Sequence, residues 1–204
     1  MDTKKLAFSL MIGALGSAFF AVSYYFGPLA PGVNLDFSLI AVFIAGFFGG
    51  PTVGAFSGLI AGILPGIMFG PLGMGGALGL VGLPFGKALS GLTSGMVGKG
   101  LRLGGEKQRP SILGIPASFL SYVPETLFTI GYFVFLQGLT VGSTTYFVYI
   151  LPKALVELTI ISVIIAALMG NSGFCNFTKI FTKAECKRKT NTSQEGNLST
   201  NRDQ

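Results

Sequence analysis

Residues 43–70 read FIAGFFGGPTVGAFSGLIAGILPGIMFG, and within this apolar stretch a glycine returns at every fourth position. These glycines are Gly46, Gly50, Gly54, Gly58, Gly62, Gly66 and Gly70. At 3.6 residues per turn, this spacing draws a slowly rotating stripe along one side of a helix. In a membrane, stripes of small residues let helix backbones approach closely. The pattern therefore predicts tightly packed apolar helices, and it would also suit a helix that slides or tilts against its neighbours.

The composition of the whole chain indicates a membrane protein. Of its 204 residues, 50% are hydrophobic and 11% are charged, whereas soluble domains carry about 25% charged residues. The net charge is +6, but the basic residues flank apolar runs and are not interleaved with aromatic ones, so nucleic-acid binding is not expected. There is no histidine, and Cys175 and Cys186 lack CxxC spacing. We therefore expect no metal site, no cofactor and two free thiols.

Six apolar segments are candidates to cross a bilayer. They are residues 6–26, 35–48, 52–69, 74–98, 112–136 and 145–169. The first could be a cleaved signal peptide, but its apolar run of about 21 residues favours an uncleaved span. Residues 171–204 are polar, so we expect a disordered tail after a transmembrane domain of residues 1–170.

The basic residues set the expected orientation of these spans. All Lys and Arg residues except Lys87 and Lys153 fall in the N-terminus, the 99–111 loop and the C-terminal tail. Six spans place all three segments on one side, which is the cytoplasm by the positive-inside rule. The sequence thus predicts an all-α protein of the cell membrane, a compact bundle of six transmembrane helices with both termini in the cytoplasm.

Four ionisable residues, Lys87, Glu125, Lys153 and Glu157, lie well inside predicted spans. A charge at the bilayer centre costs about 2.5–3.5 kcal/mol, so such residues are usually functional or paired. Residue counts along the spans put all four at similar depth, and prolines precede three of them: Pro84, Pro124 and Pro152. One interpretation is a solute or ion site formed by broken helices. The other is a structural ion-pair network, such as Lys153 with Glu157 one turn later.

Three further residues are candidates for the same site. Tyr122 lies three residues before Glu125, on nearly the same helix face, where it could stack on or hydrogen-bond a ligand. Asn34 and Asp36 are predicted at the outer mouth, and residues 27–33 before them could form a lid.

A small-residue pattern occurs in the first predicted helix, where Ala14 and Ala18 form an AxxxA motif. Such a face serves either internal helix packing or docking of another membrane protein. The chain has no Walker motif and no GxSxG motif, so we do not expect an enzyme or an ATPase. Accumulative uptake of a solute would then need a partner or an ion gradient.

In combination, these features resemble the substrate-binding S component of energy-coupling factor (ECF) transporters. The resemblance rests on six spans with cytoplasmic termini, the AxxxA motif, the glycine-rich segment 43–64, and YILPKALVELTII at residues 149–161. It implies a subunit that captures a small vitamin-like or metabolite solute and works with a transmembrane coupling protein and two cytoplasmic ATPases. It also implies that Ala14 and Ala18 face the coupling protein.

The resemblance further implies a substrate pocket near the outer face. Its positions here would be Asn34, Asp36, Lys87, Tyr122, Glu125, Lys153 and Glu157. The lysines would meet a carboxylate or phosphate of the solute, and the glutamates a cationic or donor group. The chain has no tryptophan, which many relatives stack on a ring, so the sequence does not name the substrate. The alternatives are a stand-alone ion-coupled carrier with titrating glutamates, and a membrane sensor or scaffold domain.

Overall fold

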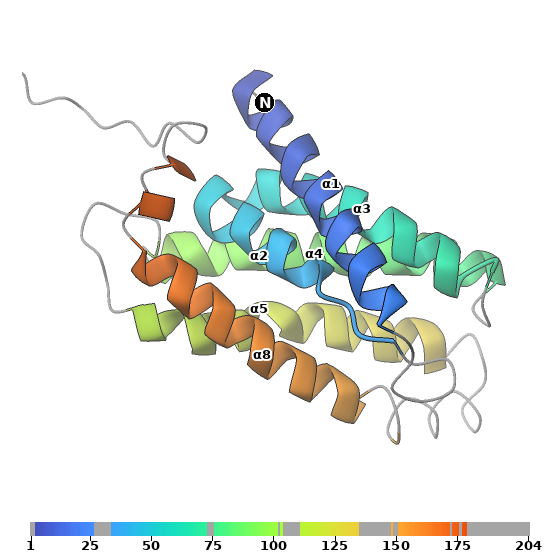
Figure 1. Ribbon diagram of the computed structural model, residues 1–204. Coiled ribbons are helices and arrows are strands. Elements are labelled where there is room, and N and C mark those ends of the chain that lie inside the picture. Colours follow the sequence, from blue (N-terminus) through green and yellow to red (C-terminus); the bar gives the residue numbers. More distant parts are fainter. Residues whose placement is uncertain are drawn as a thin grey trace, which may run out of the picture.

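The computed structural model describes residues 3–26, 34–72, 76–101, 103, 111–134, 148, 151–171, 173–175 and 177–178. Within these ranges all regular structure is helical (Figure 1), so the all-α prediction is confirmed there. The α-helices are α1 (Thr3–Tyr25), α2 (Ser38–Gly49), α3 (Pro51–Phe69), α4 (Gly76–Leu101), α5 (Gly114–Thr129) and α8 (Leu151–Gly170). A 3-10 turn, Ser111–Leu113, precedes α5, and a π-helix, Ile130–Val134, extends it.

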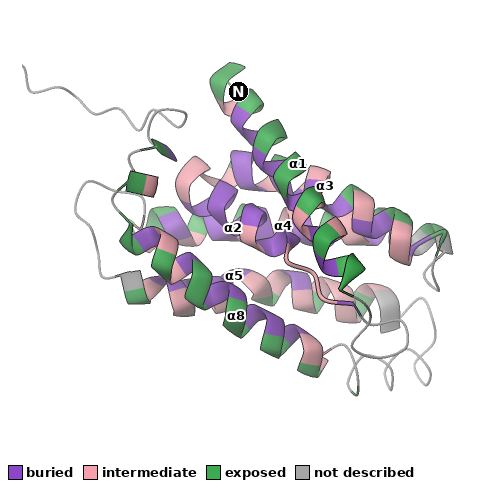
Figure 2. Cartoon of the chain, in the orientation of Figure 1, coloured by how far each residue is buried: buried purple, intermediate pink, exposed green. Residues whose placement is uncertain are grey.

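Three of these helices, α1, α3 and α8, are long and apolar enough to cross a membrane, judged by length and composition. Their outward sides carry large exposed apolar side chains, among them Leu10, Ile63 and Val156. Figure 2 shows buried residues on the sides where helices face one another and exposed residues on the outer sides. An apolar outer surface of this extent suits a lipid environment better than water. The structure therefore supports a membrane-embedded protein.

The short helix α2 occupies the centre of the arrangement, in contact with α1, α3, α4 and α8 (Figure 1). Ala41, Val42, Phe43 and Ala45 of this helix are fully buried. A helix that is apolar on all sides is expected to be enclosed by its neighbours. The sequence-predicted span 35–48 thus corresponds to a 12-residue core helix.

The glycine stripe lies at the contact between α3 and α4, which run side by side (Figure 1). A Cβ atom at Gly54 would overlap the carbonyl group of Gly91, and one at Gly58 would overlap the carbonyl group of Lys87. Such contacts form only where backbones meet without side chains between them. The prediction of close packing is confirmed, and the packing holds the backbone of Lys87 against α3.

The turn between α2 and α3 needs glycine for its backbone conformation. Gly50 has φ of 88°, in the region that residues with a Cβ rarely adopt. Its N–H donates a hydrogen bond to the Gly46 carbonyl, with N and O 2.9 Å apart. Pro51 follows as the first residue of α3, where its missing N–H costs nothing. Gly50 is therefore the only residue between the end of α2 at Gly49 and the start of α3 at Pro51.

The prolines do not break the helices as expected. α4 and α5 continue through Pro84 and Pro124. α8 begins at Leu151, so Pro152 lies in its first turn, where helices tolerate proline. The expectation of broken helices is therefore wrong for α4 and α5. Lys153 and Glu157 also lie in the first two turns of α8, and the predicted start of this span at residue 145 lies outside the described residues.

Beyond α8, the first residues of the predicted tail remain in contact with the helices. The ring of Phe174 packs edge-on against that of Phe48, with centroids 5.4 Å apart, and Thr178 is buried. The prediction of disorder for residues 179–204 lies outside the described residues.

Candidate functional site

A buried ion pair joins α4 to the segment that leads into α2. Nζ of Lys87 lies 2.5 Å from Oδ2 of Asp36 and donates a second hydrogen bond to Oγ of Ser38 at 2.7 Å. The other carboxylate oxygen of Asp36 accepts hydrogen bonds from the N–H and the hydroxyl of Ser38, at 3.0 and 2.5 Å. Lys87 is only 2% exposed. Asp36 thus accepts the N–H of the first residue of α2 and neutralises a lysine held in place by glycine packing.

Glu157 connects α8 to the same segment. Its Oε2 lies 2.8 Å from Nζ of Lys153, four residues earlier on the helix, and its Oε1 accepts a hydrogen bond from the backbone N–H of Asp36. Glu157 is 3% exposed. The sequence left open whether Lys153 and Glu157 pair within the helix or find partners elsewhere. In the structure Glu157 does both. Its Oε2 pairs with Lys153 within α8, and its Oε1 accepts a hydrogen bond from the Asp36 N–H outside this helix.

Glu125 comes to this cluster from α5 but is paired differently. It is 7% exposed, and its Oε2 accepts a hydrogen bond from the hydroxyl of Ser90, with the oxygens 2.5 Å apart. Among the described residues, no ammonium group lies within ion-pair distance of it. Lys87 and Glu125 are nevertheless close enough to interact electrostatically. Nearby, the hydroxyl of Thr93 donates to the Ser121 carbonyl at 2.7 Å, which ties α4 to α5.

Gly86 and Phe128 lie beside Glu125, with Tyr132 next to Phe128 and Gly82 next to Tyr132, and the sequence reasoning missed all four. The rings of Phe128 and Tyr132 stack with centroids 5.3 Å apart, and Tyr132 lies directly on Gly82. A Cβ at Gly86 would lie 3.4 Å from Cγ of Glu125 and 3.6 Å from the Phe128 ring. Positions 125, 128 and 132 follow i, i+3, i+7 spacing, a signal that could have revealed this shared face.

Asn34 and Tyr122 occupy different surroundings. Asn34 is 9% exposed, and its Oδ1 accepts no hydrogen bond in the described part of the chain. The next residue, Leu35, accepts a hydrogen bond from the Ser23 hydroxyl at 3.0 Å, which fastens this segment to α1. Tyr122 is half-buried and packs against the hydrophobic core. Asn34 thus lies two residues before Asp36 in the chain, whereas Tyr122 packs against the hydrophobic core.

The two alanines of the AxxxA motif face outward. Ala14 and Ala18 are exposed on α1, whereas Gly13 and Gly16 make the inner contacts. A Cβ at Gly16 would lie 2.7 Å from Cβ of Ala61 on α3. Glycines therefore serve the internal packing of α1, and the alanines remain free on its outer side.

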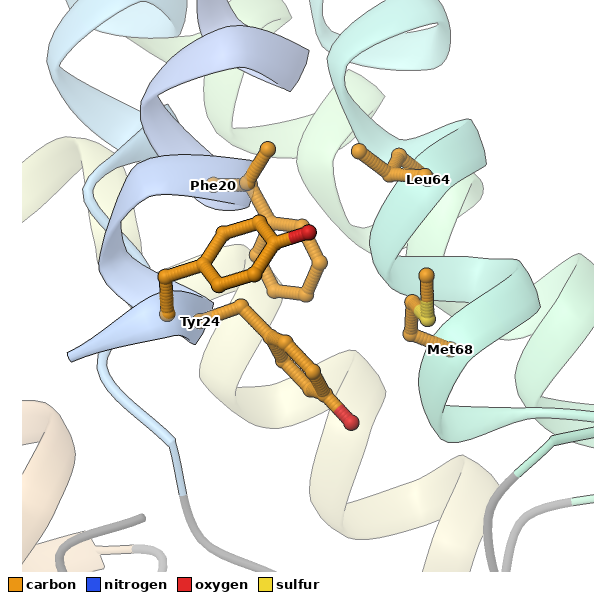
Figure 3. Close-up of a pocket in the computed structure, with 6 residues that line it drawn as sticks. Phe20, Tyr24, Leu64 and Met68 are labelled. Carbon is orange, nitrogen blue, oxygen red and sulfur yellow. The ribbon is translucent and has the colours of Figure 1, made fainter. Parts of the chain in front are cut away.

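Figure 3 shows an apolar groove between α1 and α3 that the sequence did not indicate. Its volume is about 270 Å³, and it is lined by Phe20, Ala21, Tyr24, Tyr25, Leu64 and Met68. None of the charged residues described above contributes to its lining. The groove is therefore a feature separate from the charged cluster.

Comparison of the chain with protein-family models, with curated proteins and with solved structures gave no match. The functional argument therefore rests on the geometry of this site.

Proposed function

We propose that this protein is the substrate-binding S component of an ECF-type uptake transporter. In this proposal it spans the cell membrane six times, with both termini in the cytoplasm. It captures a small vitamin-like or metabolite solute at the outer face and passes it inward with the help of ATP-hydrolysing partner subunits. The observation that carries the proposal is the convergence of buried charged residues from α4, α5, α8 and the segment before α2 in an otherwise apolar protein.

A purely structural role accounts poorly for this cluster. Taking charges out of water costs several kcal/mol per ion, and buried ion pairs seldom repay that cost with net stability. The glycine contacts between α3 and α4 already hold the helices together without any charge. Ionisable residues that a membrane protein retains at such positions mark solute or ion sites in most cases. Because helix packing does not require these charges, a binding role explains their presence better than a structural role.

The outward alanines support the proposed partner. Exposed small residues on α1 give a smooth strip against which another transmembrane helix can pack closely. The sequence has no nucleotide-binding motif, so ATP-driven import needs separate ATPases and a membrane protein to couple them. We assign Ala14 and Ala18 to contact with that coupling protein.

Co-purification tests the proposal directly. A tagged chain would be extracted gently from the membranes of its own organism, and proteins retained with it would be identified by mass spectrometry. We expect a transmembrane coupling protein and two ATPases. Ala14→Leu and Ala18→Leu should deplete these partners. Ala77→Leu is the matched control, since Ala77 is exposed on α4 outside the proposed contact.

Two results would contradict the proposal. One is that no ATPase co-purifies while the tagged chain itself is intact. The other is that the purified chain alone drives solute uptake into liposomes under a proton or sodium gradient, which would establish the ion-coupled carrier instead.

A further inference from the structure

The buried cluster contains more acidic than basic side chains. The carboxylates are those of Asp36, Glu125 and Glu157, and the ammonium groups are those of Lys87 and Lys153. Residues 27–33, 73–75 and 135–150, which connect helices in the sequence, contain no Asp, Glu, Lys or Arg. Among the described residues of the cluster, three carboxyl groups therefore stand against two ammonium groups, an excess of one acidic group.

Both ammonium groups are already engaged. Lys87 lies against Asp36 and Ser38, and Lys153 lies against Glu157. A solute anion would have to displace one of these carboxylates to reach a lysine, and it would add negative charge to a cluster that already has an excess. Burying like charges together is unfavourable at low dielectric constant. The lysines are thus poorly placed to receive a carboxylate or phosphate.

The carboxylate without an ammonium partner among the described residues is that of Glu125, and one of its oxygens has no hydrogen-bond donor among them. Oε2 accepts a hydrogen bond from the neutral Ser90 hydroxyl, while Oε1 accepts none from the described residues. A buried carboxylate with so few donors is costly to desolvate. Oε1 lies 3.8 Å from the position that a Cβ of Gly86 would occupy. The free oxygen therefore borders the space that this glycine leaves open.

An aromatic ring also borders this space. An edge carbon of the Phe128 ring lies 3.6 Å from the same Cβ position, and cations are attracted to the faces of aromatic rings. A buried carboxylate oxygen with no donor among the described residues and an adjacent aromatic ring both suit a positive group that carries hydrogen-bond donors.

We propose that the solute bound here is an organic monocation with N–H donors, held by the carboxylate of Glu125 beside Gly86 and Phe128. A metal ion is a poorer match: it donates no hydrogen bond, and the described residues contain no group of three candidate ligands. The inference rests on the proposed function, because it names the chemical class of the captured solute.

Three small compounds of similar size test the charge requirement. They are ethanolamine, which is a primary ammonium at pH 7, the neutral ethylene glycol, and the anion glycolate. Each would be titrated into the purified full-length chain in detergent micelles at constant ionic strength, with thermal unfolding as the readout. A ligand that binds the folded state raises its melting temperature. We expect a saturable rise with ethanolamine and none with ethylene glycol, glycolate or sodium chloride.

Two variants place the effect at Glu125. In Glu125→Gln, the half-maximal concentration of ethanolamine should increase about 10- to 100-fold, the usual cost of losing a charged hydrogen bond. Glu106→Gln removes the same charge from the hydrophilic loop between α4 and α5 and should leave the titration unchanged. Gly86→Ala should also weaken binding while the fold persists, because the added methyl group meets only ordinary contact distances. Gly100→Ala is its control on the same helix, since a Cβ there meets nothing within 4 Å.

The outcomes separate this inference from the proposed function. Equal stabilisation of wild type and Glu125→Gln, stabilisation by glycolate or sodium only, or no response to ethanolamine would each overturn the cation assignment. If partners still co-purify in that case, the transporter proposal stands without it. If ethanolamine binds through Glu125 but no ATPase co-purifies, the cation site remains and the transporter proposal fails.

Discussion

Lys87 and Asp36 form a buried ion pair, 2.5 Å from Nζ to Oδ2, that links α4 to the start of α2. The two residues are 51 positions apart in the chain. Their contact exists because Gly58 lets the backbone of Lys87 lie directly against α3. The close packing of α4 against α3 therefore also fixes where the charge of Lys87 lies.

Breaking this ion pair from one side should destabilise the protein strongly. Lys87→Met leaves Asp36 buried without its cation, which typically costs about 3–5 kcal/mol. The double variant Lys87→Met/Asp36→Asn should regain much of that loss, because no unpaired charge remains. Equilibrium unfolding in mixed micelles measures both. Lys99→Met, at an exposed lysine of α4, is the control and should change stability by less than about 0.5 kcal/mol. Strict additivity of the two single variants would show that the pair is not coupled.

Glu157 should protect the backbone amide of Asp36 from hydrogen exchange, because its Oε1 accepts that N–H. Glu157→Leu removes the acceptor, and loss of a hydrogen bond to a charged group should accelerate exchange about 10- to 100-fold. Mass spectrometry of peptides covering residues 34–38 gives the rate. Thr159→Val is the control on the same helix, since the exposed Thr159 hydroxyl bonds only to the Leu155 carbonyl. Unchanged exchange in Glu157→Leu would mean that this contact is not formed in the protein.

Alanine at Gly54 should destabilise the protein although alanine favours helices. Its Cβ would overlap the Gly91 carbonyl, and overpacking of this kind costs about 1–3 kcal/mol. The same substitution at Gly100 meets open space and should be neutral or stabilise by up to about 1 kcal/mol. Unfolding of the two variants side by side measures the difference. Equal stability would argue against the close contact of α3 with α4.

The proposed topology predicts which engineered cysteines are reachable from outside the cell. In a background with Cys175 and Cys186 replaced by serine, Thr140→Cys should react with a membrane-impermeant maleimide in intact cells. Gly105→Cys should react only after the membrane is permeabilised, because it lies in the basic loop assigned to the cytoplasm. The reverse pattern would overturn the assignment of both termini to the cytoplasm.

Much of the helical architecture follows from the sequence. Each long helix of the structure lies in an apolar segment predicted as a span. The bounds of α3 match the predicted span 52–69 within one residue. The structure describes α8 from Leu151 onward, and the predicted start of this span at residue 145 lies outside the described residues. The prediction that proline breaks α4 and α5 was wrong. Whether it breaks a helix depends on the packing around it, which the sequence does not display.

The candidate site was predicted only in part. Buried charges are rare enough in apolar segments that Lys87, Glu125, Lys153 and Glu157 stand out by composition alone. Asp36 was assigned to the outer mouth, and its ion pair with Lys87 could not be foreseen across 51 residues. Phe128 was overlooked because aromatic residues are common in membrane helices, and only its place beside Glu125 and Gly86 gives it meaning.

The sequence by itself determined that the chain forms apolar helices, which of them pack through glycine, and which charges must be enclosed. These properties depend on composition and on spacing along a single helix, and both can be read locally. Only the tertiary structure decided which charge meets which. Among the described residues, Glu157 is paired with Lys153 one turn earlier on α8 and with the backbone N–H of Asp36, whereas Glu125 meets the Ser90 hydroxyl of α4 and no ammonium group. The energy of an ion pair depends on the distance between its charges and is large at low dielectric constant, so the packing of the helices in three dimensions decides which pairs form.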